Sequence, residues 1–180
     1  MSEQILITGA NGGFGTLIVD ALLDAGHRVA ASMRAVTGRN AAVAERLRQR
    51  GAQLIEIDVT HDASVEAGVR AAAEALGGLT VLINNAGVGV SGLQEAFTAD
   101  DFKRLFDVNV VGVQRMNRAV LPLFREQHNG LLVHVSSLLG RITVPFYGPY
   151  NATKWAVEAL AETYRVELSP FGVETVVVEP

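Results

Sequence analysis

Hydrophobic residues along the chain gather into two kinds of segment that alternate from one end to the other. The first kind is a short run of β-branched or aliphatic residues without regular polar alternation. Such a run is typical of a strand that is covered on both faces of a sheet. The expected strands are residues 5–7, 29–31, 54–57, 81–83, 131–135 and 173–178.

The second kind of segment carries apolar residues three and four positions apart, which is the spacing of one helical face. These expected helices are residues 17–22, 41–50, 65–76, 102–124 and 152–168, and glycines at 26, 51, 77–78 and 130 are expected to end helices. Strands that alternate with helices predict a parallel sheet with right-handed crossovers. The expected fold is therefore α/β: a Rossmann-type, doubly wound sheet in the order 3-2-1-4-5-6, with helices on both faces.

Composition narrows the classes of protein that this pattern can represent. A chain of 180 residues predicts one domain, and its net charge of −4 disfavours nucleic acid or an anionic membrane as a partner. The absence of cysteine excludes disulfides, thiolate metal sites and a cysteine nucleophile, and no metal site is expected. No signal-peptide pattern and no apolar run of about 18 residues is present, so a cytoplasmic location is expected.

A glycine-rich loop at residues 8–15 joins the first expected strand to the first expected helix. Glycines let the backbone approach a pyrophosphate closely, and free N–H groups at the helix start face its negative charge. The rival loop of NTPases ends in Gly-Lys-Ser/Thr, and this loop has no lysine. With a simple turn as the alternative, the loop predicts dinucleotide binding through Gly9, Asn11, Gly12, Gly13, Phe14 and Gly15.

The end of the second strand bears on which dinucleotide binds. An acidic side chain there would hold the 2′-hydroxyl of NAD, whereas arginine accommodates the 2′-phosphate of NADP. Met33 occupies the strand tip and Arg34 follows it, so we expect NADP rather than NAD. The alternative is that Arg34 only solvates the strand end. Asp58, with Val59, could meet the adenine edge from the third strand, or it could cap the next helix.

Tyr150 and Lys154 are four residues apart at the start of the last expected helix, so both side chains project from one face. A phenol ordinarily has a pKa of about 10, and a neighbouring ammonium favours its ionised form. Tyr150 could then exchange a proton with a carbonyl or alcohol oxygen. Tyr147 lacks this partner, because Asn151 stands at the matching position. On its own, such a pair is also common on helix surfaces.

Polar residues elsewhere in the chain are further candidates for the same site. Ser136 and Ser137 end the fifth strand, where a hydroxyl could stabilise a negatively charged substrate oxygen or merely cap a loop. Asn109 lies inside a long expected helix, where asparagine is unfavourable without a local reason. One reason would be a backbone distortion with a bound water; the alternative is that the asparagine side chain is simply exposed to solvent. The turn after the fourth strand is expected beside the cofactor, through Asn85, Ala86 and Gly87.

Together these motifs resemble those of the short-chain dehydrogenase/reductase family, over the whole chain. The family motif Thr-Gly-x-x-x-Gly-x-Gly is present at 8–15, although the same residues also satisfy the pattern of the extended branch. The sequence Asn-Asn-Ala-Gly at 84–87 is similar to the motif of the ordinary, smaller branch. Tyr-x-x-x-Lys is matched at 150–154, and Ser137 has the family's spacing of thirteen residues to the tyrosine.

The resemblance implies roles for single residues. Asn109, Ser137, Tyr150 and Lys154 would be the catalytic set, and Asn109 would hold a proton-relay water. Asp58 would contact adenine, while Tyr150 and Lys154 would also contact the cofactor, the lysine through the nicotinamide ribose. The implied activity is an NADP(H)-dependent oxidoreductase that interconverts a ketone or aldehyde and an alcohol, with the tyrosine as acid or base.

Two alternatives stay open: a dinucleotide-binding module that is inactive or regulatory, and an isomerase, dehydratase or epimerase that keeps its cofactor bound. Family members normally continue after the sixth strand with Pro-Gly, a substrate-covering segment and a seventh strand, and this sequence ends at Pro180. Residues 1–180 are therefore expected to form one dinucleotide-binding catalytic domain without the substrate lid and the seventh strand.

The remaining expectations concern partners. Loops at 88–93 and 138–146 are mostly apolar, which favours a small apolar carbonyl or alcohol substrate. Left-over apolar residues on the helices at 100–127 and 150–168 predict a homodimer or homotetramer through these helices, as the family resemblance also implies. The alternative to an interface is that these apolar residues pack only against one another within the chain. These residues are Val113, Met116, Val120, Trp155, Val157 and Leu160.

Overall fold

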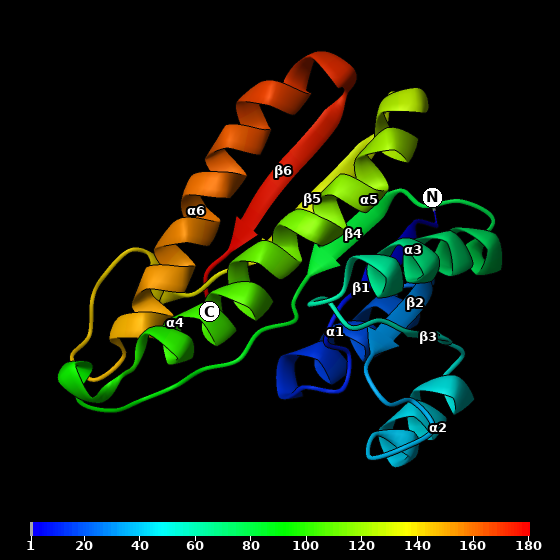
Figure 1. The fold of residues 1–180 in the computed structure, drawn as a ribbon. Coiled ribbons are helices and arrows are strands. Elements are labelled where there is room, and N and C mark those ends of the chain that lie inside the picture. Colours follow the sequence, from blue (N-terminus) through cyan, green and yellow to red (C-terminus); the bar gives the residue numbers. More distant parts are fainter. Residues whose placement is uncertain (1) are drawn as a thin grey trace.

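A computed structural model of the chain describes residues 2–180. Its six parallel strands form one sheet in the order β3-β2-β1-β4-β5-β6, which confirms the expected fold (Figure 1). The order reverses between β1 and β4, and open α/β sheets bind ligands at such a switch point. The strands are β1 Gln4–Ile7, β2 Arg28–Met33, β3 Gln53–Glu56, β4 Val81–Asn84, β5 Gly130–Val135 and β6 Val173–Val178.

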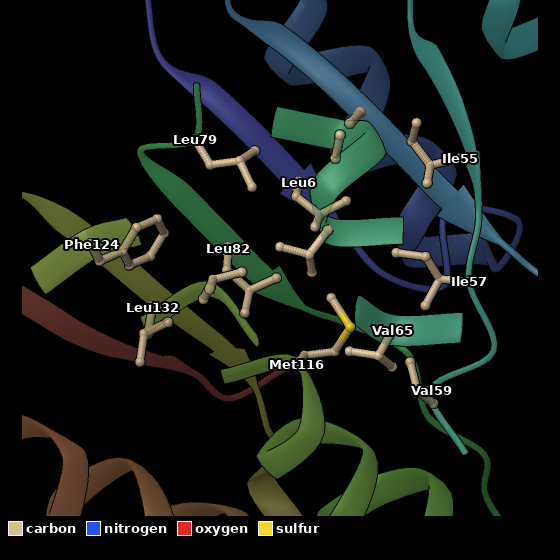
Figure 2. Packing of buried hydrophobic residues seen from close by; sticks show 14 of the residues in the cluster. Leu6, Ile55, Ile57, Val59, Val65, Leu79, Leu82, Met116, Phe124 and Leu132 are labelled. Atoms are coloured by element: carbon tan, nitrogen blue, oxygen red, sulfur yellow. The ribbon is translucent and has the colours of Figure 1, made fainter. Parts of the chain in front are cut away.

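Helices cover both faces of the sheet, and each face has its own hydrophobic core. Leu6 packs with α3 and α5 on one face, as Figure 2 shows for Met116 and Phe124, whereas Ile5 and Ile7 pack with α1 and α2 on the other. No helix in residues 2–180 is long and apolar enough to cross a bilayer. The helices are α1 Gly13–Asp24, α2 Ala41–Gln49, α3 Asp62–Leu76, α4 Ala99–Phe106, α5 Gly112–Glu126 and α6 Gly148–Leu168.

The long helix that the sequence predicts before β5 is interrupted by a π-helical turn. The turn spans Asp107–Val111 and joins α4 to α5. It contains Asn109, so the expected backbone distortion at this asparagine is confirmed. Single π turns inside longer helices are often found at functional sites.

Gly130 does not end a helix, so this expectation was wrong. α5 ends at Glu126, and Gly130 is the first residue of β5. A Cβ atom at this glycine would overlap the ring of Phe124, so the position needs glycine for packing. Gly77, in contrast, does end α3, with a φ of 69°.

Most of the residues expected to form a partner surface are buried in the core. Val113, Met116, Val120 and Val157 are at most 6% exposed, so this expectation was wrong for them. The physical reason is that α5 packs against α3 as well as against the sheet and therefore buries a wider face than a helix with one neighbour. Trp155 does lie exposed on α6, and Leu160 is partly buried.

The edge strand β6 is not covered on both faces. Val173 and Thr175 are buried, whereas the alternating residues Glu174, Val176 and Val178 are exposed. Figure 1 shows α6 running alongside β6, with no helix drawn against the opposite face of this strand within residues 2–180. The nearly continuous hydrophobic run of β6 therefore predicts the strand correctly, and within residues 2–180 only α6 covers it.

Candidate active site

The glycine-rich loop connects β1 to the N-terminus of α1. Gly9 has a φ of 66°, and a Cβ on it would lie 2.8 Å from Cα of Ala86. A Cβ on Gly15 would overlap the carbonyl oxygen of Gly9, so the helix can approach the loop only without a side chain there. Gly12 caps α1, no side chain occupies the free N–H groups, and the first turn carries no acid. This arrangement fits a pyrophosphate.

Thr8 ties this loop to the turn after β4. Its hydroxyl accepts hydrogen bonds from the backbone N–H groups of Asn85 and Ala86, at 3.1 and 3.0 Å. The side-chain amide of Asn85 in turn donates to the carbonyl oxygens of Thr8 and Gly9, at 2.9 and 3.1 Å. The sequence reasoning did not assign Thr8 a role, although its place at the head of the glycine motif was a usable signal.

A cavity of about 320 Å³ opens at the switch point between β1 and β4. Five residues that the sequence did not single out for binding also line it: Met33, Ile57, Thr60, Val88 and Val108. Every cofactor-binding candidate other than Tyr150 and Lys154 lines it, namely Gly9, Asn11, Gly12, Gly13, Phe14, Gly15, Arg34, Asp58, Val59, Asn85, Ala86 and Gly87.

Arg34 and Asp58 face each other across one end of this cavity. Arg34 Nη1 lies 3.7 Å from Asp58 Oδ2, and the arginine side chain is half exposed. Burial acts to raise the pKa of Asp58, but hydrogen bonds from Thr60, followed by the charges of Arg34 and His61, outweigh it and lower that pKa. His61, not Asp58, is the N-cap residue of α3, so the capping alternative for Asp58 does not hold.

Asn109 joins three segments of the site. Its Oδ1 accepts a hydrogen bond from the N–H of Val88 at 2.9 Å, and its Nδ2 donates to the Val88 carbonyl at 2.9 Å. The same Nδ2 donates to the hydroxyl of Thr153 at 3.1 Å, and this hydroxyl donates to the carbonyl of Tyr150 at 2.8 Å. The π turn is thus fastened both to the loop after β4 and to the start of α6. The relay water implied for Asn109 stays a prediction.

Arg115 braces the π turn from the first turn of α5. Its guanidinium donates to the Asp107 carboxylate at 2.8 Å, to the Val59 carbonyl at 3.1 Å and to Asp62 at 2.8 Å. These bonds connect the turn that carries Asn109 to the loop after β3, where Val59 lines the cavity. Because the partners are 8 to 56 residues away along the chain, the sequence reasoning did not find this residue.

Tyr150 and Lys154 lie on the first turns of α6. Lys154 is 7% exposed, its ammonium donates to the Val135 carbonyl at 2.8 Å, and Nζ lies 5.5 Å from the centre of the Tyr150 ring. Burial lowers the pKa of Lys154 to about 8, while the charge of Glu158 acts in the opposite direction. A deeply buried ammonium near a phenol favours proton exchange by that phenol.

Ser137 is the accessible serine at the end of β5. It is half-buried, and its hydroxyl accepts a hydrogen bond from the N–H of Leu139 at 3.2 Å. Ser136 is 3% exposed, so its hydroxyl cannot meet a substrate in the crevice. Of the two serines, Ser137 is thus the more accessible, and its catalytic role stays a prediction.

Two of the catalytic candidates, Asn109 and Tyr150, lie against the loop after β4, which forms part of the cavity wall. A Cβ on Gly87, which lines the cavity, would lie 3.4 Å from Asn109 Oδ1, and one on Gly89 would lie 3.9 Å from the Tyr150 ring. No group of three or more histidine, aspartate or glutamate side chains within residues 2–180 could hold a metal ion. The geometry thus brings Tyr150 and Lys154 close to the loop that continues the wall of the cavity.

Comparison with known proteins gives a consistent result. The family model described as "short chain dehydrogenase" matches residues 3–180. The chain is 34% identical to a 3-ketodihydrosphingosine reductase of Bacteroides thetaiotaomicron over 99% of its own length and 63% of the relative. It is 37% identical to retinol dehydrogenase 16 of Mus musculus, over 99% of its own length and 56% of the relative. The chain thus spans less than two thirds of the length of these relatives.

Solved structures of similar proteins have the same fold. A short-chain dehydrogenase from Streptomyces avermitilis aligns with a TM-score of 0.90 and 33% identity over 100% of this chain and 66% of its own. The protein ElxO, solved with NADP, aligns with 0.91 and 26% identity over 100% of this chain and 73% of its own. A short-chain dehydrogenase/reductase from Burkholderia phymatum, solved with NAD, aligns with 0.89 and 33% identity over 98% of this chain and 64% of its own.

Proposed function

Because this chain belongs to the short-chain dehydrogenase family, we propose that it is an NADP(H)-dependent oxidoreductase interconverting a small apolar carbonyl compound and its alcohol. One observation carries this proposal: Tyr150, with Lys154 Nζ over its ring, lies against Gly89, and the residues just before Gly89 line a cavity that also contains the glycine-rich start of α1. Carbonyl-dependent oxidation of NADPH by the protein tests it, together with the Tyr150 variant described in the Discussion.

The chain's own residues divide the work of such a reaction. The N–H groups at the start of α1 and the Gly9–Gly15 loop bind the pyrophosphate, and Asp58 receives the adenine. A nicotinamide bound there would supply or accept the hydride. Tyr150 donates its proton to the carbonyl oxygen during reduction, and Ser137 hydrogen-bonds the same oxygen. Lys154 stabilises the resulting phenolate.

Asn109 fixes the relative positions of the segments that carry these groups. Its amide bonds to Val88 and to Thr153 connect the cavity wall to the helix that carries Tyr150 and Lys154. Positioning of this kind contributes to rate because misplacement of about 1 Å can cost roughly 100-fold. In the proposed mechanism Asn109 also holds a water that replenishes the proton.

An apolar substrate is supported by the side chains around the mouth of the site. Val88, Leu93, Leu138 and Phe146 are large, apolar and 43–59% exposed. The N–H of Gly92 donates to the Phe146 carbonyl at 2.8 Å, which joins the loop after β4 to the loop before α6. Two relatives are named for a keto compound and an alcohol, in line with this reaction class.

Replacing Arg34 by alanine is expected to weaken NADPH binding about 10- to 100-fold while NADH binding changes little. The reason is that one charge-assisted guanidinium–phosphate contact is worth about 1.5–3 kcal/mol. Titration of both cofactors against wild type and variant measures the change. Arg28→Ala is the matched control, since Arg28 is exposed at the opposite end of the same strand. An unchanged NADPH preference in Arg34→Ala would show that another residue selects the cofactor.

We also propose that the protein forms a homodimer through the helical regions 100–127 and 150–168, with a tetramer as a possible extension. The exposed apolar residues that support this are Val111, Leu123, Trp155 and Val166, which differ from most of those named from the sequence. Light scattering at micromolar concentration should give twice the mass of one chain, and Trp155→Glu should shift it to the monomer. A monomer mass for the wild type contradicts the proposal. A cytoplasmic location stays a prediction.

A further inference from the structure

One turn after Lys154 on α6, a carboxylate lies in the interior. Glu158 is 5% exposed, and neither of its oxygens accepts a hydrogen bond from any residue in the range 2–180. Its one close charged partner is Arg141, whose Nη2 lies 3.0 Å from Glu158 Oε2. Arg141 offsets part of the cost of burying this carboxylate, but a buried ion pair often stabilises a protein no more than apolar side chains would, so stability alone is a weak reason for Glu158.

Glu158 lies against the turn Leu138–Gly140, which follows Ser137. A Cβ on Gly140 would lie 3.0 Å from Glu158 Oε1 and 2.8 Å from the hydroxyl of Ser136. The carboxylate therefore occupies the space under the turn 138–140, which follows Ser137. Arg141 leaves the same turn and also donates from Nε to Glu179 at 2.8 Å, so it joins this turn to α6 and to the end of β6.

On α6, the titratable groups beside the Lys154 ammonium are Tyr150, whose ring centre lies 5.5 Å from Nζ, and Glu158, one turn further on. β5 contributes the carbonyl of Val135, which accepts from Nζ, and the buried His134, whose pKa is lowered to about 4 by burial.

The other charged groups on elements packed against α6 are paired with one another. Arg141 in the turn after β5 pairs with Glu158 and Glu179, and Asp107 in the π turn pairs with Arg115. Glu158 is the group whose charge opposes the effect of burial on the pKa of Lys154.

We propose that Glu158, held by Arg141, is a positioning residue that keeps the Lys154 ammonium protonated and in place beside Tyr150. This inference rests on the proposed function, because the charge of Lys154 matters only if Lys154 supports Tyr150. Arg141 pairs with the Glu158 carboxylate at 3.0 Å, and this ion pair fixes the turn after Ser137 against α6.

The charge of Lys154 can be measured without cofactor or turnover. The chain has two lysines, Lys103 and Lys154, so ¹³Cε-lysine labelling gives two side-chain signals to follow against pH by NMR. Lys103 is exposed and serves as the internal reference, and the Lys103→Arg variant assigns its signal. Lys154 should titrate near its pKa of about 8. In Glu158→Gln its midpoint should fall by about one further unit, a tenfold loss of proton affinity.

A matched control is available on the same helix. Glu162 lies one turn after Glu158, is exposed, and pairs with Arg165 at 3.3 Å, so Glu162→Gln should leave the Lys154 midpoint unchanged. Glu158→Asp keeps the charge with a shorter side chain and should cause a smaller fall. If Glu158→Gln does not fold, the Asp variant decides the question. An unchanged Lys154 midpoint in whichever of these variants folds overturns the inference.

Kinetics then separate this inference from the proposed function. In Glu158→Gln, kcat/KM should be about tenfold lower above pH 8 and close to wild type near pH 6, because Lys154 loses its proton earlier. A uniform loss at every pH would instead indicate general damage and overturn the positioning role. If the NMR midpoint shifts but the wild type reduces no carbonyl compound, the proposed function fails and the charge coupling still stands.

Discussion

Tyr150→Phe is expected to abolish carbonyl reduction while NADPH still binds. The variant loses only the hydroxyl that donates the proton, and general acid catalysis contributes about 100- to 10,000-fold. We therefore expect kcat to fall at least about 1000-fold. The phenyl ring keeps its place near Gly89 and beneath Lys154, so cofactor affinity should change by less than about threefold. Steady-state NADPH oxidation and fluorescence titration measure the two quantities.

Tyr147→Phe is the matched control for this experiment. Tyr147 is three residues earlier, is exposed, and contributes only its backbone carbonyl to α6, through the N–H of Asn151. Its variant should keep wild-type kcat. Substantial carbonyl reduction by Tyr150→Phe would show that another group donates the proton. Equal NADPH binding with no turnover by wild type and variants alike would favour the alternative of a dinucleotide-binding module.

Gly15→Ala is expected to destabilise the protein and to weaken NADPH binding at least tenfold. The added methyl would overlap the Gly9 carbonyl and lie 2.9 Å from Cα of Ala10, and both neighbours are backbone that cannot rotate away. Overpacking of this kind costs about 1–3 kcal/mol of unfolding free energy, and it moves α1 away from the loop that binds the pyrophosphate. Urea unfolding and cofactor titration measure the two effects.

Gly13→Ala tests whether the ligand needs space at the start of α1, at a position where an added methyl does not disturb packing inside the protein. A Cβ on Gly13 meets no heavy atom within 4 Å, and Gly13 is the first residue of α1. Alanine is a better helix former than glycine by about 1 kcal/mol, so stability should stay equal or rise slightly. A loss of NADPH binding in this variant would then reflect close approach of the ligand. Equal unfolding curves for the Gly13 and Gly15 variants would contradict the packing argument for Gly15.

The location of the site was predictable because its residues are tied to local backbone features. Glycines at a strand-to-helix turn, a polar turn after β4 and a tyrosine–lysine pair at helical spacing are all visible within a few consecutive residues. Parallel topology then brings strand ends together at one edge, so residues far apart in the chain meet. Asn109 was informative for a related reason: an asparagine inside a helix suggested a backbone distortion, and the structure shows one, with the asparagine buried rather than exposed.

The sequence by itself determined the order of the strands and helices, the switch point and twelve of the residues that line the cavity, because these depend on periodicity and on local turn chemistry. Only the tertiary structure decided which apolar positions face solvent. Met116 and Val120 are buried because the sheet and α3 pack against them, and the sequence of their own helix does not reveal these neighbours. The tertiary structure likewise decided the surroundings of Arg115 and Glu158. Their partners come from other elements, and burial and charge pairing arise only when those elements pack.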